Sequence, residues 1–502
     1  MMIKNYFPKT FFALLLTVYG ASLAQAQTVT IALSGDINNF DPAQTASIGT
    51  DLSVLSNVYP ALILRAPDRR LTPSLATKWV ALDDNTWDFT LVSNAHFING
   101  EPIDAQTVAW NINRILNKKK VTVAASWYSR IQEVIILSPT HLQIKTSSPF
   151  PALPDQLSML FLLPPKWTQT HDPSHEVSSG GPYIIDEIVP GDHVSMHANP
   201  DYFGPQASFK KAVYRIIPEI TTALYALETG AVDYVSKIPT AQLGQINREP
   251  DLIAGSTPSI WSVFIKINTE IPPFNNEIVR KALNYAVDKK SIVATIFNNQ
   301  TTTSTCQVLT PAYFGYNKDL TAYKYAPETA RKLIKQSGIN LNQVYEFDIP
   351  RGSYLQGDEV ALAVQQMFQA VGIKTKLRLI DFGNYIAKYR KTHKLAPLSL
   401  LGQAWPTLDA DGFLSLFQTG NPYSYWNNPL FDAALQTGDS TTNHDLRQNA
   451  YMQATQIMCE QAPVVFMYTE PATYAHAKRV LMTPRGDGWL RAFDMHLRPN
   501  SL

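Results

Sequence analysis

The segment at residues 267–293 constrains the fold of this chain more than any other part of the sequence. Its sequence, INTEIPPFNNEIVRKALNYAVDKKSIV, predicts a strand that ends at Asn268, a proline-containing loop and then one long helix. Apolar residues recur at helical spacing, so one face of that helix must be buried: Ile278, Val279, Ala282, Leu283 and Ala286. The segment therefore indicates an α/β protein, in which helices cover a sheet.

The first 26 residues have the three parts of a secretory signal peptide. Lys4 and Lys9 give a basic start, the apolar stretch TFFALLLTVY follows, and AQA at 24–26 supplies the small residues that a signal peptidase reads. The apolar stretch is too short to cross the ~30 Å core of a bilayer comfortably. We therefore expect cleavage before Gln27 and a soluble periplasmic protein. No lipid anchor is expected, because no Cys stands at the cleavage point. A buried N-terminal helix is the alternative.

Length and charge narrow the class of protein. About 475 residues would remain after cleavage, which is too many for one hydrophobic core and enough for two or three lobes. The formal net charge is +1 and no helix carries a stripe of Lys or Arg. Nucleic acid and an anionic membrane surface are therefore not expected as partners.

The two cysteines, Cys306 and Cys459, leave two interpretations open. They could pair in an oxidising periplasm. They could equally be a loop thiol and a buried helix thiol, and from the sequence we slightly favour unpaired thiols. No Cys-x-x-Cys or Cys/His pattern is present, so the sequence indicates neither a structural zinc site nor another cofactor.

Strand and helix patterns alternate along the rest of the chain without a long low-complexity linker. Residues 28–33 and 86–91 read as strands, and residues 104–117 predict a helix with one apolar face. Pro327 and Gly338 bracket another helix in the order typical of helix starts and ends. A helix at 358–370 is followed directly by the strand KTKLRLI, which again favours α/β layering.

A series of motifs runs along the mature chain: FDP at 40–42, PSLATKW at 73–79, NTWDFTLVSNAHFINGEPIDAQTVAWNINRI, SSGGPY at 178–183, NPDYFG at 199–204, ALETGAVDYV, INTEIPPFNNEIVRKALNYAVD, LTPAYFGY, PRGSYLQGDEVALAVQQMFQAVGIKTKLRLID and APVVFMY. Each motif, and their order, resembles the family 5 extracellular solute-binding proteins, which are the peptide and nickel receptors of ABC importers. Several motifs are weak alone, but together they cover essentially the whole mature chain. The resemblance implies a receptor, not a catalyst.

The resemblance implies a bilobed periplasmic-binding-protein fold (type II, cluster C), with two α/β lobes, hinge strands and an extra subdomain in lobe I. Mapped onto this chain, lobe I would take residues 27–262, with the subdomain at about 57–163, lobe II residues 268–463, and the return to lobe I residues 464–502. The strands WSVFIKIN (261–268) and VVFMY (464–468) would cross between the lobes. Such a receptor closes on its ligand, and the permease subunits of the importer recognise the closed form. A monomer is expected.

The resemblance also assigns a candidate binding loop, LGQAWPTLDADGF, which contains Gly402, Gln403, Ala404 and Trp405. Peptide receptors of the family carry a glycine where Gly402 stands. The aspartate with which they bind the ligand's α-amine should fall near Pro406 and is absent. This departure puts a standard dipeptide or oligopeptide ligand in doubt.

Two acidic residues of the same loop have competing roles. Asp409 and Asp411 could bind the ligand, or they could cap the helix that FLSLF would begin. Capping is the better interpretation for Asp411, and the two roles are balanced for Asp409.

Trp405 is the strongest single candidate, because it lies in a polar loop and offers apolar surface together with one N–H donor. Packing at the lobe surface is its alternative role. Arg351 could pair with a ligand carboxylate or remain a solvated loop charge. Weaker candidates follow by analogy with loops that line the cleft: Asn38, Asn39, Trp127, Tyr354 and Tyr423.

Metal binding and catalysis are the other classes to weigh. The pairs His171/His175 and His193/His197 are four residues apart, but the first pair spans a proline and the second lies in an expected strand, where the two side chains are too far apart for one ion. Nickel held by a small chelator remains an alternative. No HExxH, GxSxG or glycine-rich phosphate loop indicates an enzyme. The sequence therefore favours a receptor for a small peptide-like solute, with sensing or chaperoning as further alternatives.

Overall fold

The computed structural model describes residues 27–117 and 122–499. The predicted signal peptide lies outside these residues, so its cleavage stays a prediction. No helix within the described ranges is long and apolar enough to cross a membrane.

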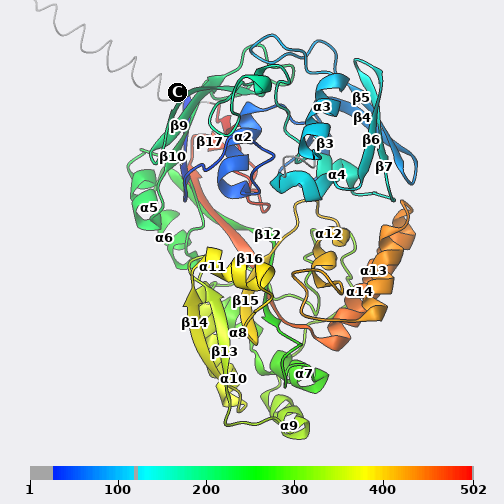
Figure 1. The fold of residues 1–502 in the computed structure, drawn as a ribbon. Helices are drawn as coiled ribbons and strands as arrows, with labels where there is room; N and C mark the ends of the chain where they lie inside the picture. Colours follow the sequence, from blue (N-terminus) through cyan, green and yellow to red (C-terminus); the bar gives the residue numbers. More distant parts are fainter. Residues whose placement is uncertain (1–26, 118–121, 500–502) are drawn as a thin grey trace, which may run out of the picture.

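A ten-stranded mixed sheet runs through the whole molecule, in the order β14-β13-β15-β12-β16-β11-β1-β10-β9-β8. Two bodies of helices and strands surround it, the upper one being lobe I and the lower one lobe II in Figure 1. The strands of the sheet are β1 (Thr28–Leu33), β8 (Tyr183–Val189), β9 (His193–Ala198), β10 (Lys211–Ile216), β11 (Tyr234–Ser236), β12 (Leu252–Ile267), β13 (Val344–Pro350), β14 (Lys374–Ile380), β15 (Leu398–Gln403) and β16 (Val464–Ala477).

The long antiparallel strands β12 and β16 connect the two lobes. β12 begins in lobe I, where Leu252 pairs with Ala477, and ends in lobe II, where Lys266 pairs with Val464. Pro258 lies opposite Pro471, and the register shifts just beyond this pair. Because proline cannot donate to the ladder, the two strands are held less tightly there than on either side.

The parallel strands of the two lobes point toward each other. In lobe I, β1 runs parallel to β10 and β11, and β11 is antiparallel to β16. In lobe II, β13 runs parallel to β14 and β15, and β15 is antiparallel to β12. Since β12 runs from lobe I to lobe II, the carboxyl ends of both parallel sets face the space between the lobes.

Lobe I carries an additional subdomain, seen at the upper right in Figure 1. A four-stranded antiparallel sheet, β4-β5-β7-β6, packs with a helix around its own apolar core. Its elements are β2 (Ile63–Arg65), β3 (Leu71–Pro73), β4 (Ala76–Asp83), β5 (Thr86–Leu91), α3 (Ala105–Ile115), β6 (Ile131–Ser138), β7 (His141–Thr146) and α4 (Leu153–Leu157). The rest of lobe I contains α2 (Ser53–Val58), α5 (Ile220–Glu228), α6 (Leu243–Ile246), β17 (Val480–Leu481) and β18 (His496–Leu497).

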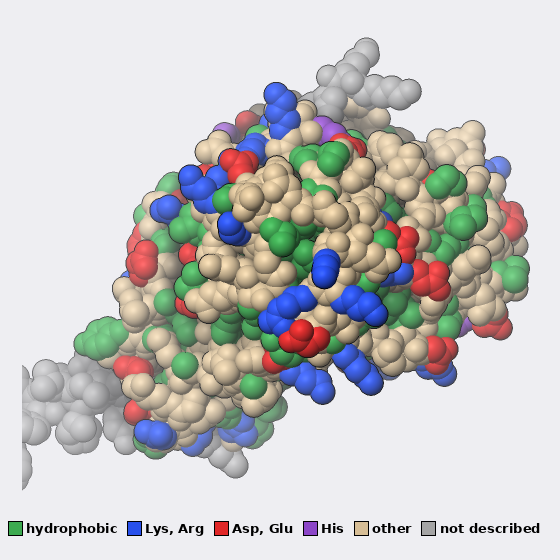
Figure 2. All heavy atoms as spheres, turned by 90° about the horizontal axis from the view of Figure 1, so that it is seen from below, with side chains coloured by type: hydrophobic (Ala, Val, Ile, Leu, Met, Phe, Trp, Pro, Cys, Tyr) green, Lys and Arg blue, Asp and Glu red, His purple; other side chains and the backbone are tan. Residues whose placement is uncertain are grey.

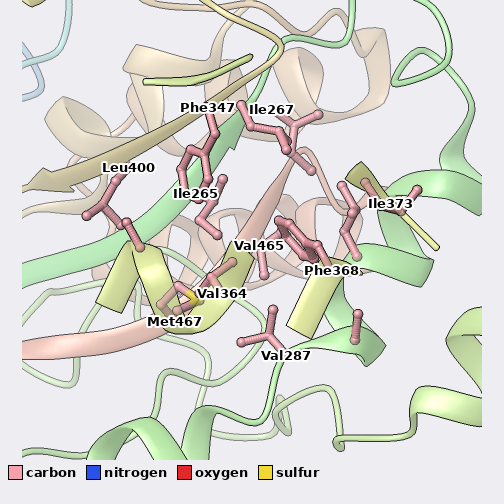
Figure 3. Close-up of a cluster of buried hydrophobic side chains, with 14 of the residues drawn as sticks. Ile265, Ile267, Val287, Phe347, Val364, Phe368, Ile373, Leu400, Val465 and Met467 are labelled. Atoms are coloured by element: carbon pink, nitrogen blue, oxygen red, sulfur yellow. The ribbon is translucent and has the colours of Figure 1, made fainter. Parts of the chain in front are cut away.

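In lobe II, helices cover both faces of the sheet. One core combines side chains of β12, β13, β16 and α10, among them Ile265, Phe347, Val465 and Phe368 in Figure 3. The helices of this lobe are α7 (Glu277–Ala286), α8 (Lys289–Thr295), α9 (Pro327–Ser337), α10 (Gly357–Ala370), α11 (Phe382–Ile386), α12 (Ala410–Leu414), α13 (Pro429–Asp439) and α14 (His444–Gln461). On the face of the molecule that is seen from below, Lys and Arg side chains are interspersed with Asp and Glu side chains (Figure 2).

The helix predicted from the opening segment is confirmed in type but not in length. Its predicted apolar face is buried in α7, except for Ile278, which is half-buried. The chain does not continue as one long helix: α7 ends at Ala286, and Asp288 caps a new helix, α8, by accepting a hydrogen bond from the backbone N–H of Ser291 at 3.0 Å. An N-cap carboxylate inside a helical pattern was the signal that the sequence prediction passed over.

The two cysteines form a disulfide, which corrects the favoured prediction of unpaired thiols. The Sγ atoms of Cys306 and Cys459 are 2.00 Å apart, and the residues are separated by 153 positions. The bridge joins a loop of lobe II to the last turns of α14. Such a contact depends on how lobe II folds, so spacing in the sequence could not reveal it.

Candidate functional site

The carboxyl ends of the parallel neighbouring strands β13 and β15 bring the predicted loops of lobe II together. Arg351 and Tyr354 follow β13, and Gln403, Ala404 and Trp405 form the end of β15 and the loop after it. In open α/β sheets, ligands bind in the crevice beyond the carboxyl ends of the strands. We use "the crevice" for the space between these ends and the corresponding ends in lobe I.

Trp405 is partly buried and lies against α12. Its backbone N–H donates a hydrogen bond to the hydroxyl of Tyr313 at 2.7 Å. Its indole covers Gly412 so closely that a Cβ at that position would be 1.9 Å from Nε1. The indole can therefore occupy this position only because residue 412 is a glycine.

Tyr354 is positioned in a similar way by a glycine of β15. A Cβ at Gly402 would lie 2.6 Å from the Tyr354 ring, so the tyrosine packs flat against the strand. Burial raises the pKa of the Tyr354 hydroxyl, and the nearby Glu470 carboxylate contributes to the same shift. Arg351, in the same loop, is exposed, and its backbone N–H donates to the carbonyl of Ile380 at 2.8 Å.

Asp409, not Asp411, is the N-cap of the helix in this loop, because α12 begins at Ala410. Both carboxylate oxygens of Asp409 are 2.8 Å from Nη2 of Arg447, and both side chains are buried. This arrangement favours a structural role for Asp409 over ligand binding. The prediction that Asp411 caps a helix starting near Phe413 is wrong, because the helix starts earlier than the apolar pattern suggested.

The remaining candidates lie in local packing arrangements. Asn38 and Asn39 follow β1 at the lobe I side of the crevice, where Asn39 accepts a hydrogen bond from Asp41 N in a turn. Trp127 packs between the core of lobe I and that of the subdomain. Tyr423 packs edge-on against Tyr389, with ring centroids 5.2 Å apart. These contacts account for the side chains without a ligand, so their binding role stays a prediction.

The subdomain contacts lobe II beside the crevice. Arg65 donates hydrogen bonds to the carbonyl of Thr407 at 3.1 Å and to Asp155 at 2.7 Å. At the far end of the subdomain, Asp84 accepts a hydrogen bond from the backbone N–H of Thr442 at 2.8 Å. A cavity of about 350 Å³ lies between the subdomain and the loop at Thr407.

The model of the bacterial extracellular solute-binding proteins, family 5 (middle), matches residues 70–425, which is well over half of the chain. The chain belongs to this family. It is 24% identical over 483 residues to the glutathione-binding protein GsiB of Salmonella paratyphi A, with 91% of each chain covered. It is 29% identical over 303 residues to the nickel-binding periplasmic protein of Escherichia coli K12, and that match covers 57% of this chain and 56% of the relative.

A solved structure supports the bilobed fold of this family 5 protein. The ABC transporter-associated periplasmic binding protein DppA from Helicobacter pylori, in complex with the peptide STSA, superimposes with a TM-score of 0.81 at 20% identity. The match covers 94% of this chain and 98% of the other. The predicted fold class, two α/β lobes of a periplasmic binding protein, is thereby confirmed.

In the second histidine pair of this solute-binding protein, each histidine lies beside an aspartate. His193 and His197 lie on strand β9, as predicted, and His197 contacts Asp186 while His193 contacts Asp192. Within residues 27–117 and 122–499, no group of three or more His, Cys, Asp or Glu side chains has the geometry to hold an ion.

Sequence reasoning missed two charged residues at the crevice. Glu470 follows the apolar run of β16, and Lys237 follows β11 with a positive φ of 57°. Glu470 lies where β16 passes between the lobes, and Lys237 directly follows the end of β11. The signal in the sequence is a carboxylate placed directly after the strand residues VVFMYT.

Proposed function

We propose that this family 5 solute-binding protein captures a small peptide or peptide-like solute in the crevice and delivers it to the permease subunits of an ABC importer in the inner membrane. It would work as a periplasmic monomer after removal of the signal peptide, and it would bind its solute without chemistry. The proposal uses the lobe boundaries given above, with motion about the crossing strands. The single observation that carries it is the meeting of two sets of parallel strand ends across the crevice.

Closure would depend on contacts that already join the lobes. Thr240 of lobe I donates a hydrogen bond from Oγ1 to Gln356 of lobe II at 3.1 Å, and Arg65 reaches Thr407 from the subdomain. A solute that touches both lobes adds to these contacts only in the closed form, so it shifts the population toward that form. The importer then has a closed surface to recognise.

The glutathione-binding relative supports a peptide-like solute, and the nickel-binding relative supports a second candidate. We infer that a metal would enter this crevice only as a complex with a small chelator, since the described part of the chain offers no set of ligands for a bare ion. Both candidates call for a small polar solute with an organic framework.

Replacing Trp405 by alanine is expected to weaken solute binding about 10- to 100-fold, because the indole contributes a large apolar surface at the crevice. Isothermal titration with dipeptides and glutathione measures the affinity, and thermal unfolding checks that the variant folds. Trp167→Ala is the matched control, since Trp167 stacks on His171 in a segment that contains none of the candidate binding residues. Equal affinity of the wild type and Trp405→Ala would remove Trp405 from the site.

A further inference from the structure

Glu470 is half-buried and lies in the short part of β16 that passes between the lobes. Gln403, the last residue of β15, is in register with Thr469 through the intervening strand β12. On the other side, Ser236 at the end of β11 pairs with Tyr474. The residues of β16 between Thr469 and Tyr474 therefore lie between the strand ends of lobe II and those of lobe I.

Both edges of the crevice approach the Glu470 side chain. Its Oε1 accepts a hydrogen bond from the backbone N–H of Leu355 at 2.7 Å, in the loop that follows β13. From lobe I, Lys237 is anchored by a hydrogen bond from its backbone N–H to Thr473 O at 3.0 Å, and its charge acts on Glu470. Glu470 forms no ion pair with any residue in the part of the chain that the structure describes.

The negative charge of the Glu470 carboxylate is stabilised by few neighbouring groups. Burial raises its pKa, against the lowering effects of the Leu355 N–H and of Lys237. A carboxylate that is partly withdrawn from water and receives one N–H is stabilised by a cation placed beside it. Two residues earlier on β16, the hydroxyl of Tyr468 is buried and has no hydrogen-bond partner among the described residues.

We propose that Glu470 recognises a primary ammonium group of the solute. An ammonium offers three N–H donors and a full positive charge, which is what a carboxylate with a free oxygen can accept. This inference rests on the proposed function and specifies it further: the solute class becomes amine-bearing peptides and related amines. The carboxylate acts from the hinge strand, so the contact forms where both lobes meet.

The test compares Glu470→Gln with the wild type by native mass spectrometry and competition titration. The probes are an equimolar mixture of dipeptides and tripeptides, and the same mixture after N-acetylation. Glutamine keeps the oxygen that accepts from Leu355 N–H and removes only the charge. We expect Glu470→Gln to bind the free-amine mixture about 10- to 100-fold more weakly, and both proteins to bind the acetylated mixture weakly. Glu359→Gln, an exposed glutamate in the first turn of α10, is the control and should bind as the wild type does.

Two results would overturn this inference and leave the proposed function intact. One is equal affinity of Glu470→Gln and wild type for free-amine peptides, and the other is wild-type affinity for acetylated peptides that equals its affinity for free ones. The acetylation comparison uses only the wild type, so it does not depend on the folding of a variant. A wild-type protein that binds neither mixture would contradict the proposed peptide-like solute itself, and the inference with it.

Discussion

The double change Cys306→Ala/Cys459→Ala is expected to lower the free energy of unfolding of lobe II by about 3–5 kcal/mol. The disulfide spans 153 positions, and a cross-link over so long a loop removes much of the conformational entropy of the unfolded chain. Chemical denaturation of the oxidised wild type, the reduced wild type and the double variant measures the difference.

The reduced wild type and the double variant should unfold at similar denaturant concentrations, and adding reductant to the variant should change nothing. These two comparisons separate the cross-link from the loss of the sulfur atoms. A difference below about 1 kcal/mol between oxidised and reduced wild type would show that the packing around α14 holds this loop without the bridge.

Asp409→Asn is expected to destabilise the protein by about 3–5 kcal/mol, because it leaves the Arg447 guanidinium buried without its carboxylate partner. Asparagine is a good N-cap, so the change removes the charge and largely retains the helix start. Denaturant unfolding at pH 7 measures the loss, and isothermal titration on the folded variant measures solute binding.

Asp445→Asn is the matched control for this experiment. Asp445 is an aspartate in the first turn of α14, in the same lobe, but its side chain is 91% exposed. Its replacement should cost below about 1 kcal/mol. If Asp409→Asn were as stable as the wild type and failed to bind solute, Asp409 would belong to the binding site and the structural interpretation would be wrong.

Local patterns in the sequence were sufficient for elements whose signals are short-ranged. The strands at 28–33 and 86–91 and the helix between Pro327 and Gly338 are confirmed with these bounds or nearly so. Each has its own alternation, cap or breaker, so neighbouring residues determine it. The resemblance added the order of the lobes, which periodicity alone does not contain.

The crossing strands show where local signals fail. Residues 261–268 were predicted as the strand, but β12 already begins at Leu252, and β16 continues past Tyr468 to Ala477. Gly255, Pro258 and Pro471 lower the strand propensity of these extensions, yet the two chains pair along them. Tertiary pairing between segments about 200 residues apart overrides the local preference.

In the candidate site, too, local sequence signals predict some features and tertiary contacts determine the others. The sequence placed Trp405 and Tyr354 in loops, but their positions depend on Gly412 and Gly402, which leave room for the two rings. The role of Asp409 depends on Arg447, and the position of Glu470 between the two lobes depends on the strand register. These partners become neighbours only in the folded chain, so the sequence could name candidates without assigning their roles.

A native mass spectrum of the protein purified from the cells that produce it, followed by release and fragmentation of whatever is bound, tests the central claim most directly. The account predicts a discrete added mass that fragments as an amine-bearing peptide or a related small solute. A protein that carries no added mass, and that also shows no thermal shift with peptides, glutathione or metal chelates, would contradict it.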